Sequence, residues 1–184
     1  ALFFLMPHMT EMKQTDIRTE FGAFKNSQVW FTVIMGVVGF GGMFSVYTYI
    51  SWTMTEVAGM DQSLIWVVLM AYGIGMTIGN AFGGWLADRN LEFGIIFALA
   101  CLIVILTAFY FLSGHAIPAT LCFGCVAFMG STLVPSLQLR LVHVAGDAQT
   151  LAAALNQSAL NIANAAGATT VSYTHLTLPT TPYV

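Results

Sequence analysis

Three amide side chains near the end of the sequence share one side of an expected helix. At 100° per residue, Gln157, Asn161 and Asn164 lie within about 60° of one another. Small residues gather on roughly the opposite side, namely Ala159, Ala163 and Gly167. Amides donate and accept hydrogen bonds, so the stripe could line a polar cavity or bond to a neighbouring helix. The small side predicts close helix packing.

A second chemical candidate is a pair of opposite charges that follows a glycine-rich stretch. Gly84 precedes Asp88 and Arg89. Asp88 follows the C-terminal end of an expected helix, where the helix dipole disfavours a carboxylate, so it needs a cationic partner or a helix N-terminus. A pair that forms in one conformation and breaks in another would act as a latch. The alternative is that both charges are solvated and only fix the topology.

The aromatic residues Phe40, Phe44 and Tyr47 follow the spacing i, i+4, i+7. Such a stripe could form the wall of a cavity for amphipathic compounds, and it could equally pack in a core. The cysteines Cys122 and Cys125 lack a second Cys or His pair, and no His, Asp and Glu set has ligand spacing. We therefore expect no metal, no cofactor and no enzymatic activity.

The composition shows which environment must position these residues. The 184 residues are 58% hydrophobic and 7% charged, whereas soluble domains carry roughly 25% charged residues. This balance excludes disorder and an ordinary soluble globule. A net charge of −3 with five Lys and Arg residues excludes a nucleic-acid surface. The sequence predicts an all-α integral membrane protein whose partner is the lipid bilayer.

Uncharged stretches locate the membrane spans, because a charge at the centre of a bilayer is costly. About 20 apolar residues cross the hydrocarbon core as a helix. The stretches predict spans near Val29–Ile50, Leu64–Leu86, Phe93–Leu112, Ile117–Leu139 and Leu151–Ala168.

The basic residues give these spans an orientation. All five Lys and Arg residues fall before the first span, between the second and third, or between the fourth and fifth. The positive-inside rule therefore makes the N-terminal segment and the loops at Arg89 and Arg140 cytoplasmic. Glu56 and Asp61 are expected on the opposite side.

The second span carries Gly75, Gly79 and Gly83 at intervals of four. Residues four apart stack on one side of a helix, and such a glycine groove lets helix backbones approach closely in lipid.

The groove leads into Gly84-Trp85-Leu86-Ala87-Asp88-Arg89, which resembles the loop signature of the major facilitator superfamily of secondary transporters. That signature lies between the second and third spans and, more degenerate, between the eighth and ninth. Residues 39–49 resemble the seventh span, and residues 154–167 the eleventh span, of its arabinose-efflux-like and drug-efflux-like branch. The resemblance covers roughly residues 1–168.

This resemblance implies that residues 29–168 form five helices of a six-helix half-bundle, the C-terminal half of a twelve-span transporter. Residues 1–7 would end the preceding span, and residues 8–28 would be the central cytoplasmic connection. The implied partner is the missing N-terminal half, which would carry the coupling acid. The implied function is export of a small organic solute, a drug-like compound or sugar, by proton antiport with alternating access in a bacterial inner membrane.

Residues 169–184 break with this composition. They are rich in Thr and Pro and show no helical period. The stretch resembles a translated sequencing adapter, so we expect it to be non-native; the alternative is a natural polar C-terminus. For the whole chain, the rival functions are a small membrane channel, a structural membrane protein or an intramembrane enzyme.

Overall fold

The computed structural model describes residues 22–176, and every regular element in that range is helical. The expected preceding span at residues 1–7, most of the connection 8–28 and the last part of the tail lie outside the described residues. The long helices are α3 (Ser27–Trp52), α4 (Ile65–Leu112), α5 (Ala116–Ala145) and α6 (Gln149–Leu176). The short elements are the 3₁₀ helices η1 (Ala23–Lys25) and η3 (Gln62–Leu64) and the π-helical turn η2 (Thr53–Val57).

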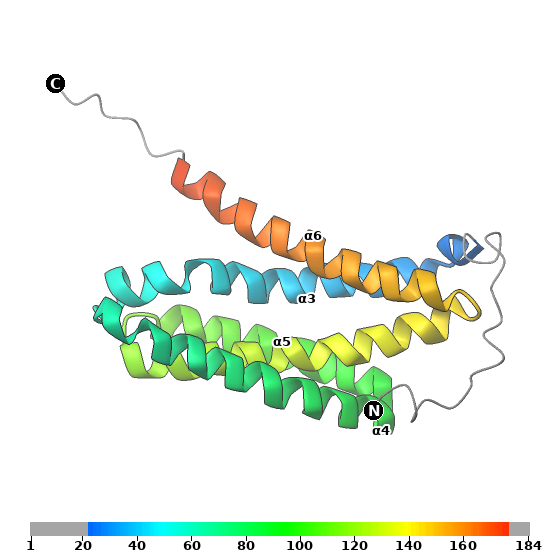
Figure 1. The fold of residues 1–184 in the computed structure, drawn as a ribbon, viewed down its shortest axis with the longest axis horizontal. Coiled ribbons are helices and arrows are strands. Elements are labelled where there is room, and N and C mark those ends of the chain that lie inside the picture. The colour runs from blue at the N-terminus through cyan, green and yellow to red at the C-terminus, as the bar shows by residue number, and fades with distance from the viewer. Residues whose placement is uncertain (1–21, 177–184) are drawn as a thin grey trace, which may run out of the picture.

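The long helices form two layers. Helix α3 lies beside α6 in one layer, while α4 and α5 form the other (Figure 1). Contacts of α5 with α3 and α6 join the layers. Figure 1 also shows α6 diverging from α3 toward its C-terminal end, although Gly167 of α6 still lies against Phe44 and Ser45 of α3.

Polar caps explain where several elements begin. The Asn26 side chain accepts a hydrogen bond from the Gln28 backbone N–H at 2.9 Å, which satisfies a donor in the first turn of α3. At the other end of the bundle, the Asp61 carboxylate accepts one from the Ser63 N–H at 2.8 Å. The hydrogen bonds from Ser63 hold the pKa of Asp61 below its usual value.

Helix α4 is two spans joined at one residue. Its 48 residues would measure about 72 Å if straight, more than twice the hydrocarbon thickness. Asn90 has a non-helical backbone (φ −156°, ψ 93°), and its side chain accepts a hydrogen bond from the Phe93 N–H at 3.1 Å. Phe109 near the end of α4 packs in one cluster with Val68 near its start, so the two sections are antiparallel. The break at Asn90 lies between the expected spans Leu64–Leu86 and Phe93–Leu112.

Three helices are long and apolar enough to cross a membrane among the described residues, namely those spanning Ser27–Val57, Gln62–Leu112 and Ala116–Ala145. The second of these contains both sections of α4. Helix α6, the fifth expected span, is not in this set. Its amides, including Asn161 and Asn164, lower its mean hydropathy.

Helix α6 runs on to Leu176, eight residues past the expected end of the fifth span at Ala168, although residues 169–184 show no helical period in the sequence. The Thr169 hydroxyl donates to the carbonyl oxygen of Ala165 at 2.9 Å, so this threonine is accommodated inside the helix. Residues 177–184 lie outside the described range.

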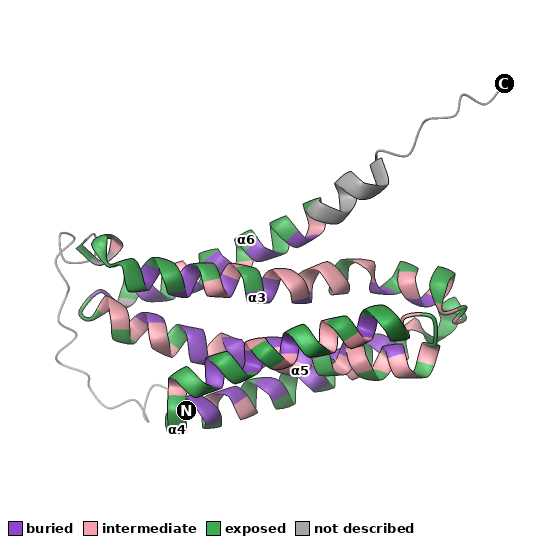
Figure 2. Cartoon of the chain, turned by 180° about the vertical axis from the view of Figure 1, so that it is seen from behind, coloured by how far each residue is buried: buried purple, intermediate pink, exposed green. Residues whose placement is uncertain are grey.

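Buried residues line the contacts between the helices, and exposed apolar residues cover the outer surfaces (Figure 2). The three buried clusters are almost entirely apolar. The outer surface of the second section of α4 carries Ile96, Ile103, Val104 and Phe111, all exposed. An apolar surface of this extent is typical of a helix that contacts lipid or another protein surface.

The bundle has one basic end. Asn26, next to Lys25, donates a hydrogen bond to the carbonyl of Val144 at 2.8 Å, and Arg140 pairs with Glu92. These contacts bring the segment before α3, the turn after Arg89 and the end of α5 to the same end.

We predict that this end is cytoplasmic. In a chain with its cysteines replaced, Ala58→Cys should react with an impermeant maleimide in intact cells, whereas Ala145→Cys should react only after permeabilisation. Ala58 lies at the opposite end from Arg140, and it is partly exposed like Ala145. Labelling of Ala145→Cys alone in intact cells would reverse the orientation.

Candidate functional site

Arg140 joins three helix segments at the basic end. Its Nε donates to the Thr32 hydroxyl at 3.2 Å, and a terminal guanidinium nitrogen lies 3.2 Å from Glu92 Oε1. The other terminal nitrogen lies 3.5 Å from Gln28 Oε1. Because Arg140 belongs to α5, this Arg140 cluster connects α5 with the start of α3 and the second section of α4. The Arg140 side chain is 19% exposed, whereas that of Glu92 is 77% exposed.

The loop signature lies beside this cluster. The Arg89 guanidinium stacks 4.3 Å from the centre of the Trp85 ring, one helical turn earlier. Asp88 is exposed, and within residues 22–176 its carboxylate has no ion-pair partner. Glu92 is the carboxylate that pairs with a cation in this conformation, and that cation is Arg140. The latch expected for Asp88 and Arg89 remains a prediction about another conformation.

The amide stripe on α6 is open. Gln157, Asn161 and Asn164 are all exposed, and none of their side chains is hydrogen-bonded to another helix within residues 22–176. Asn156 differs: it is buried, and its Nδ2 lies 3.3 Å from Gln138 Oε1 on α5. One amide of α6 therefore serves packing inside the bundle, while three face away from it.

The aromatic stripe on α3 divides between core and surface. Phe40 is fully buried in a cluster with Leu133 and Leu137 of α5, which corrects the expectation that it lines a cavity. Phe44 and Tyr47 border a hollow between α3 and the first section of α4. The remaining lining residues of this hollow are Leu69, Tyr72, Gly73 and Met76. We call it the aromatic hollow.

Three rings form a continuous series beside this hollow. The ring centre of Tyr47 lies 5.0 Å from that of Tyr72, which in turn stacks 4.6 Å from Phe123 on α5. Tyr72 is buried and Tyr47 is 45% exposed. The series runs from the core to the surface, so packing holds the Tyr72 ring in place at the hollow.

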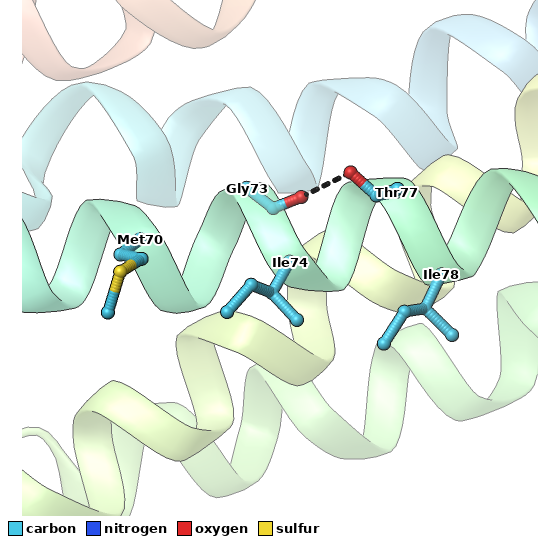
Figure 3. Close-up of a pocket in the computed structure, with 5 residues that line it drawn as sticks. All are labelled: Met70, Gly73, Ile74, Thr77 and Ile78. Atoms are coloured by element: carbon cyan, nitrogen blue, oxygen red, sulfur yellow. Dashed lines mark hydrogen bonds between the residues drawn. The ribbon is translucent and has the colours of Figure 1, made fainter.

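A second hollow lies next to the first on α4, and Gly73 borders both. Met70, Ile74, Thr77 and Ile78 complete its lining. Figure 3 shows Met70, Ile74 and Ile78 pointing to the same side of α4, while the Thr77 hydroxyl bonds back to the Gly73 carbonyl at 2.9 Å. The surface left for a partner is therefore apolar, because the threonine hydroxyl is already used.

The predicted packing residues lie at helix crossings. Gly75, Gly79 and Gly83 are buried, and a Cβ at these positions would overlap backbone carbonyl oxygens of Gly124, Phe128 and Thr132 on α5. The Thr132 hydroxyl lies 3.2 Å from the carbonyl oxygen of Gly79, which adds a polar contact across the pair. On α6, Ala159 and Ala163 are buried, and Gly167 meets Phe44 and Ser45 of α3.

Sequence reasoning missed the Arg140 cluster and Tyr72. In the sequence, Arg140 served only to assign the orientation of the spans in the membrane. Its nearly buried partner Thr32 lies one turn after Gln28, at the same end of the bundle. One signal could have identified this cluster. Gln28 and Thr32 are polar residues one turn apart at the end of one span, on the side where another span ends at Arg140. Among the described residues, no group of three or more His, Cys, Asp or Glu side chains could hold a metal ion.

The chain is similar to known transport proteins over most of its length. A profile described as Major Facilitator Superfamily matches residues 1–168. The inner membrane transport protein YdhP of Escherichia coli strain K12 is 32% identical over 168 residues, 91% of this chain and 43% of that protein. The uncharacterized MFS-type transporter YfhI of Bacillus subtilis strain 168 is 36% identical over 83% of this chain and 38% of its own length.

A chloramphenicol resistance protein of Streptomyces lividans is 30% identical over 86% of this chain and 41% of that protein. The chain thus spans less than half the length of the curated relatives it matches. No solved structure matches it. The extent of the profile match, together with the apolar helices and the loop signature, leads to one conclusion: this multi-pass membrane chain belongs to the major facilitator superfamily, a family of transporters and not of enzymes.

Proposed function

We propose that this chain is the C-terminal half of a twelve-span secondary transporter that exports a small organic solute by proton antiport. The observation that carries the proposal is the open amide stripe on α6. Gln157, Asn161 and Asn164 are exposed on a bundle whose other outer surfaces are mostly apolar. Because amides in a membrane must face protein or water, this side of α6 is suited to a cavity shared with a second half.

The aromatic hollow supports export of compounds with apolar parts. Phe44 and Tyr47 border it from α3, and α4 supplies the rest of its lining. Apolar walls with a few placed polar groups are typical of small-molecule sites. The similarity to a chloramphenicol resistance protein supports the same class of solute. The charged end supports alternating access, because ion pairs there can differ between two conformations.

Replacing one amide of the stripe tests the proposal. In the complete transporter, expressed in cells without their own efflux systems, Asn161→Leu should change which compounds are exported. The loss of one hydrogen bond worth about 1 kcal/mol should change the ratio of the cells' resistance to two compounds by about fivefold. The measurement is growth inhibition across a compound panel at equal amounts of membrane protein.

Ile162→Leu is the matched control, because it places leucine at the neighbouring exposed position outside the stripe. It should leave the export spectrum unchanged. If both variants export the wild-type spectrum, the amide stripe does not face the solute. If the wild-type transporter protects cells from no compound in the panel, export itself is the wrong function.

A further inference from the structure

Building on the proposed function, we infer that the aromatic hollow is a subsite for one planar aromatic ring of the solute, with Gly73 as its floor. Half-exposed Tyr47 supplies a ring surface, buried Tyr72 packs against Tyr47, and Gly73 supplies open space in the same lining. The inference names both the chemical class of the bound group and the residue that sets its fit.

The space at Gly73 is the first observation. A Cβ built on Gly73 meets no atom within 4 Å, in contrast to Gly75 on the same helix, whose Cβ would overlap α5. Gly73 therefore does not serve helix packing within this bundle. Its missing side chain leaves the backbone of α4 accessible, and a flat group can lie against it.

The geometry of the rings is the second observation. Tyr72 is fixed between Tyr47 and Phe123, with interplanar angles of 43° and 27°. Aromatic groups prefer tilted or offset neighbours with ring centres 4.5–7 Å apart, and such pairs contribute about 1 kcal/mol beyond the area they bury. A ring that enters the hollow extends this series without moving Tyr72.

The charge of the lining and the depth of the aromatic hollow in the bilayer indicate which group can bind there. None of the six lining residues carries a formal charge, so a carboxylate or phosphate would be desolvated there without compensation. Gly73 lies eight residues after the start of α4, about 12 Å along the helix and so near the middle of the bilayer. Transporter sites lie at this depth, whereas lipid headgroups do not reach it.

Equilibrium binding tests the subsite without requiring transport. The purified complete transporter is titrated with radiolabelled chloramphenicol, which contains a nitrophenyl ring and has no net charge. Wild-type protein should bind it saturably, and Gly73→Ala should weaken binding about tenfold because one methyl group fills the floor. Tyr47→Ala should weaken it as well, whereas Tyr47→Phe, which keeps the ring, should not.

Gly84→Ala is the control, since its Cβ also meets nothing within 4 Å but lies outside the hollow. It should bind as wild type does. Absence of saturable binding, or equal weakening by Gly73→Ala and Gly84→Ala, overturns the subsite. Binding that depends on Gly73 without any export would leave the subsite standing and refute the proposed function. Unchanged binding by Gly73→Ala together with intact export would refute the subsite and leave the proposed function standing.

Discussion

Gly79→Ala should destabilise the bundle by about 3 kcal/mol, the upper range for overpacking a close contact. The new methyl group would overlap the Phe128 backbone carbonyl, and backbone cannot move aside as a flexible side chain can. The two helices would have to separate along the groove that Gly75, Gly79 and Gly83 form. The Thr132 hydroxyl would then lose its contact with the Gly79 carbonyl. Unfolding by SDS in mixed micelles, followed by tryptophan fluorescence, measures the free energy.

Gly84→Ala separates packing from helix propensity in this experiment. It makes the same chemical change five residues later on α4, at a position where a Cβ meets nothing. Alanine favours a helix over glycine by about 1 kcal/mol, so Gly84→Ala should be neutral or stabilising. Equal stability of the two variants would mean that α4 and α5 do not pack through the glycine groove.

Arg140→Gln should slow transport by the complete transporter about tenfold while leaving its amount in the membrane unchanged. Arg140 holds the start of α3 and the second section of α4 to α5, so its loss frees three segments at one end. The effect on stability should stay below about 1 kcal/mol, because Glu92 is largely exposed and its ion pair is screened. Initial rates and KM in vesicles measure it, and KM should not change.

Two further variants locate the cause of the slower rate. Glu92→Gln removes only the ion pair and should slow transport less than Arg140→Gln does, since the contact with Thr32 remains. Asp88→Asn tests the latch expected from the loop signature and should also slow turnover. If Arg140→Gln transports at the wild-type rate, the Arg140 cluster only holds the bundle together and has no part in its movement.

Uncharged stretches of the sequence indicate where apolar helices lie, because charges are excluded from lipid, but α6, expected as the fifth span, is not among the described helices apolar enough to cross a membrane. The expected spans Phe93–Leu112 and Ile117–Leu139 correspond closely to the second section of α4 and to α5. The break at Asn90 was not predicted, although asparagine is a preferred N-cap residue and its side chain accepts a hydrogen bond from the Phe93 N–H. The non-native origin expected for residues 169–184 stays a prediction. Helix α6 passes the expected end of the fifth span because a helix that has already formed can extend through threonines such as Thr169.

The candidate site was harder to predict because α3 is apolar on all sides. In such a helix, the spacing of Phe40, Phe44 and Tyr47 identifies one side but not whether that side faces neighbours or open space. The structure separates them, since Phe40 packs against α5 while Tyr47 remains exposed. Arg140 and its partners are distant in sequence, so their association required the three-dimensional arrangement.

The break at Asn90 has a consequence for biosynthesis. Because one residue joins the two sections of α4, no aqueous loop separates the insertion of the first section from the insertion of the second section. In the orientation predicted above, the ribosome delivers both sections to the membrane as one hairpin, and Asp88, Arg89 and Glu92 stay on the side of synthesis. The break is needed for the length of α4, because a helix continuous through Asn90 would be one rod of about 72 Å, which no bilayer accommodates upright.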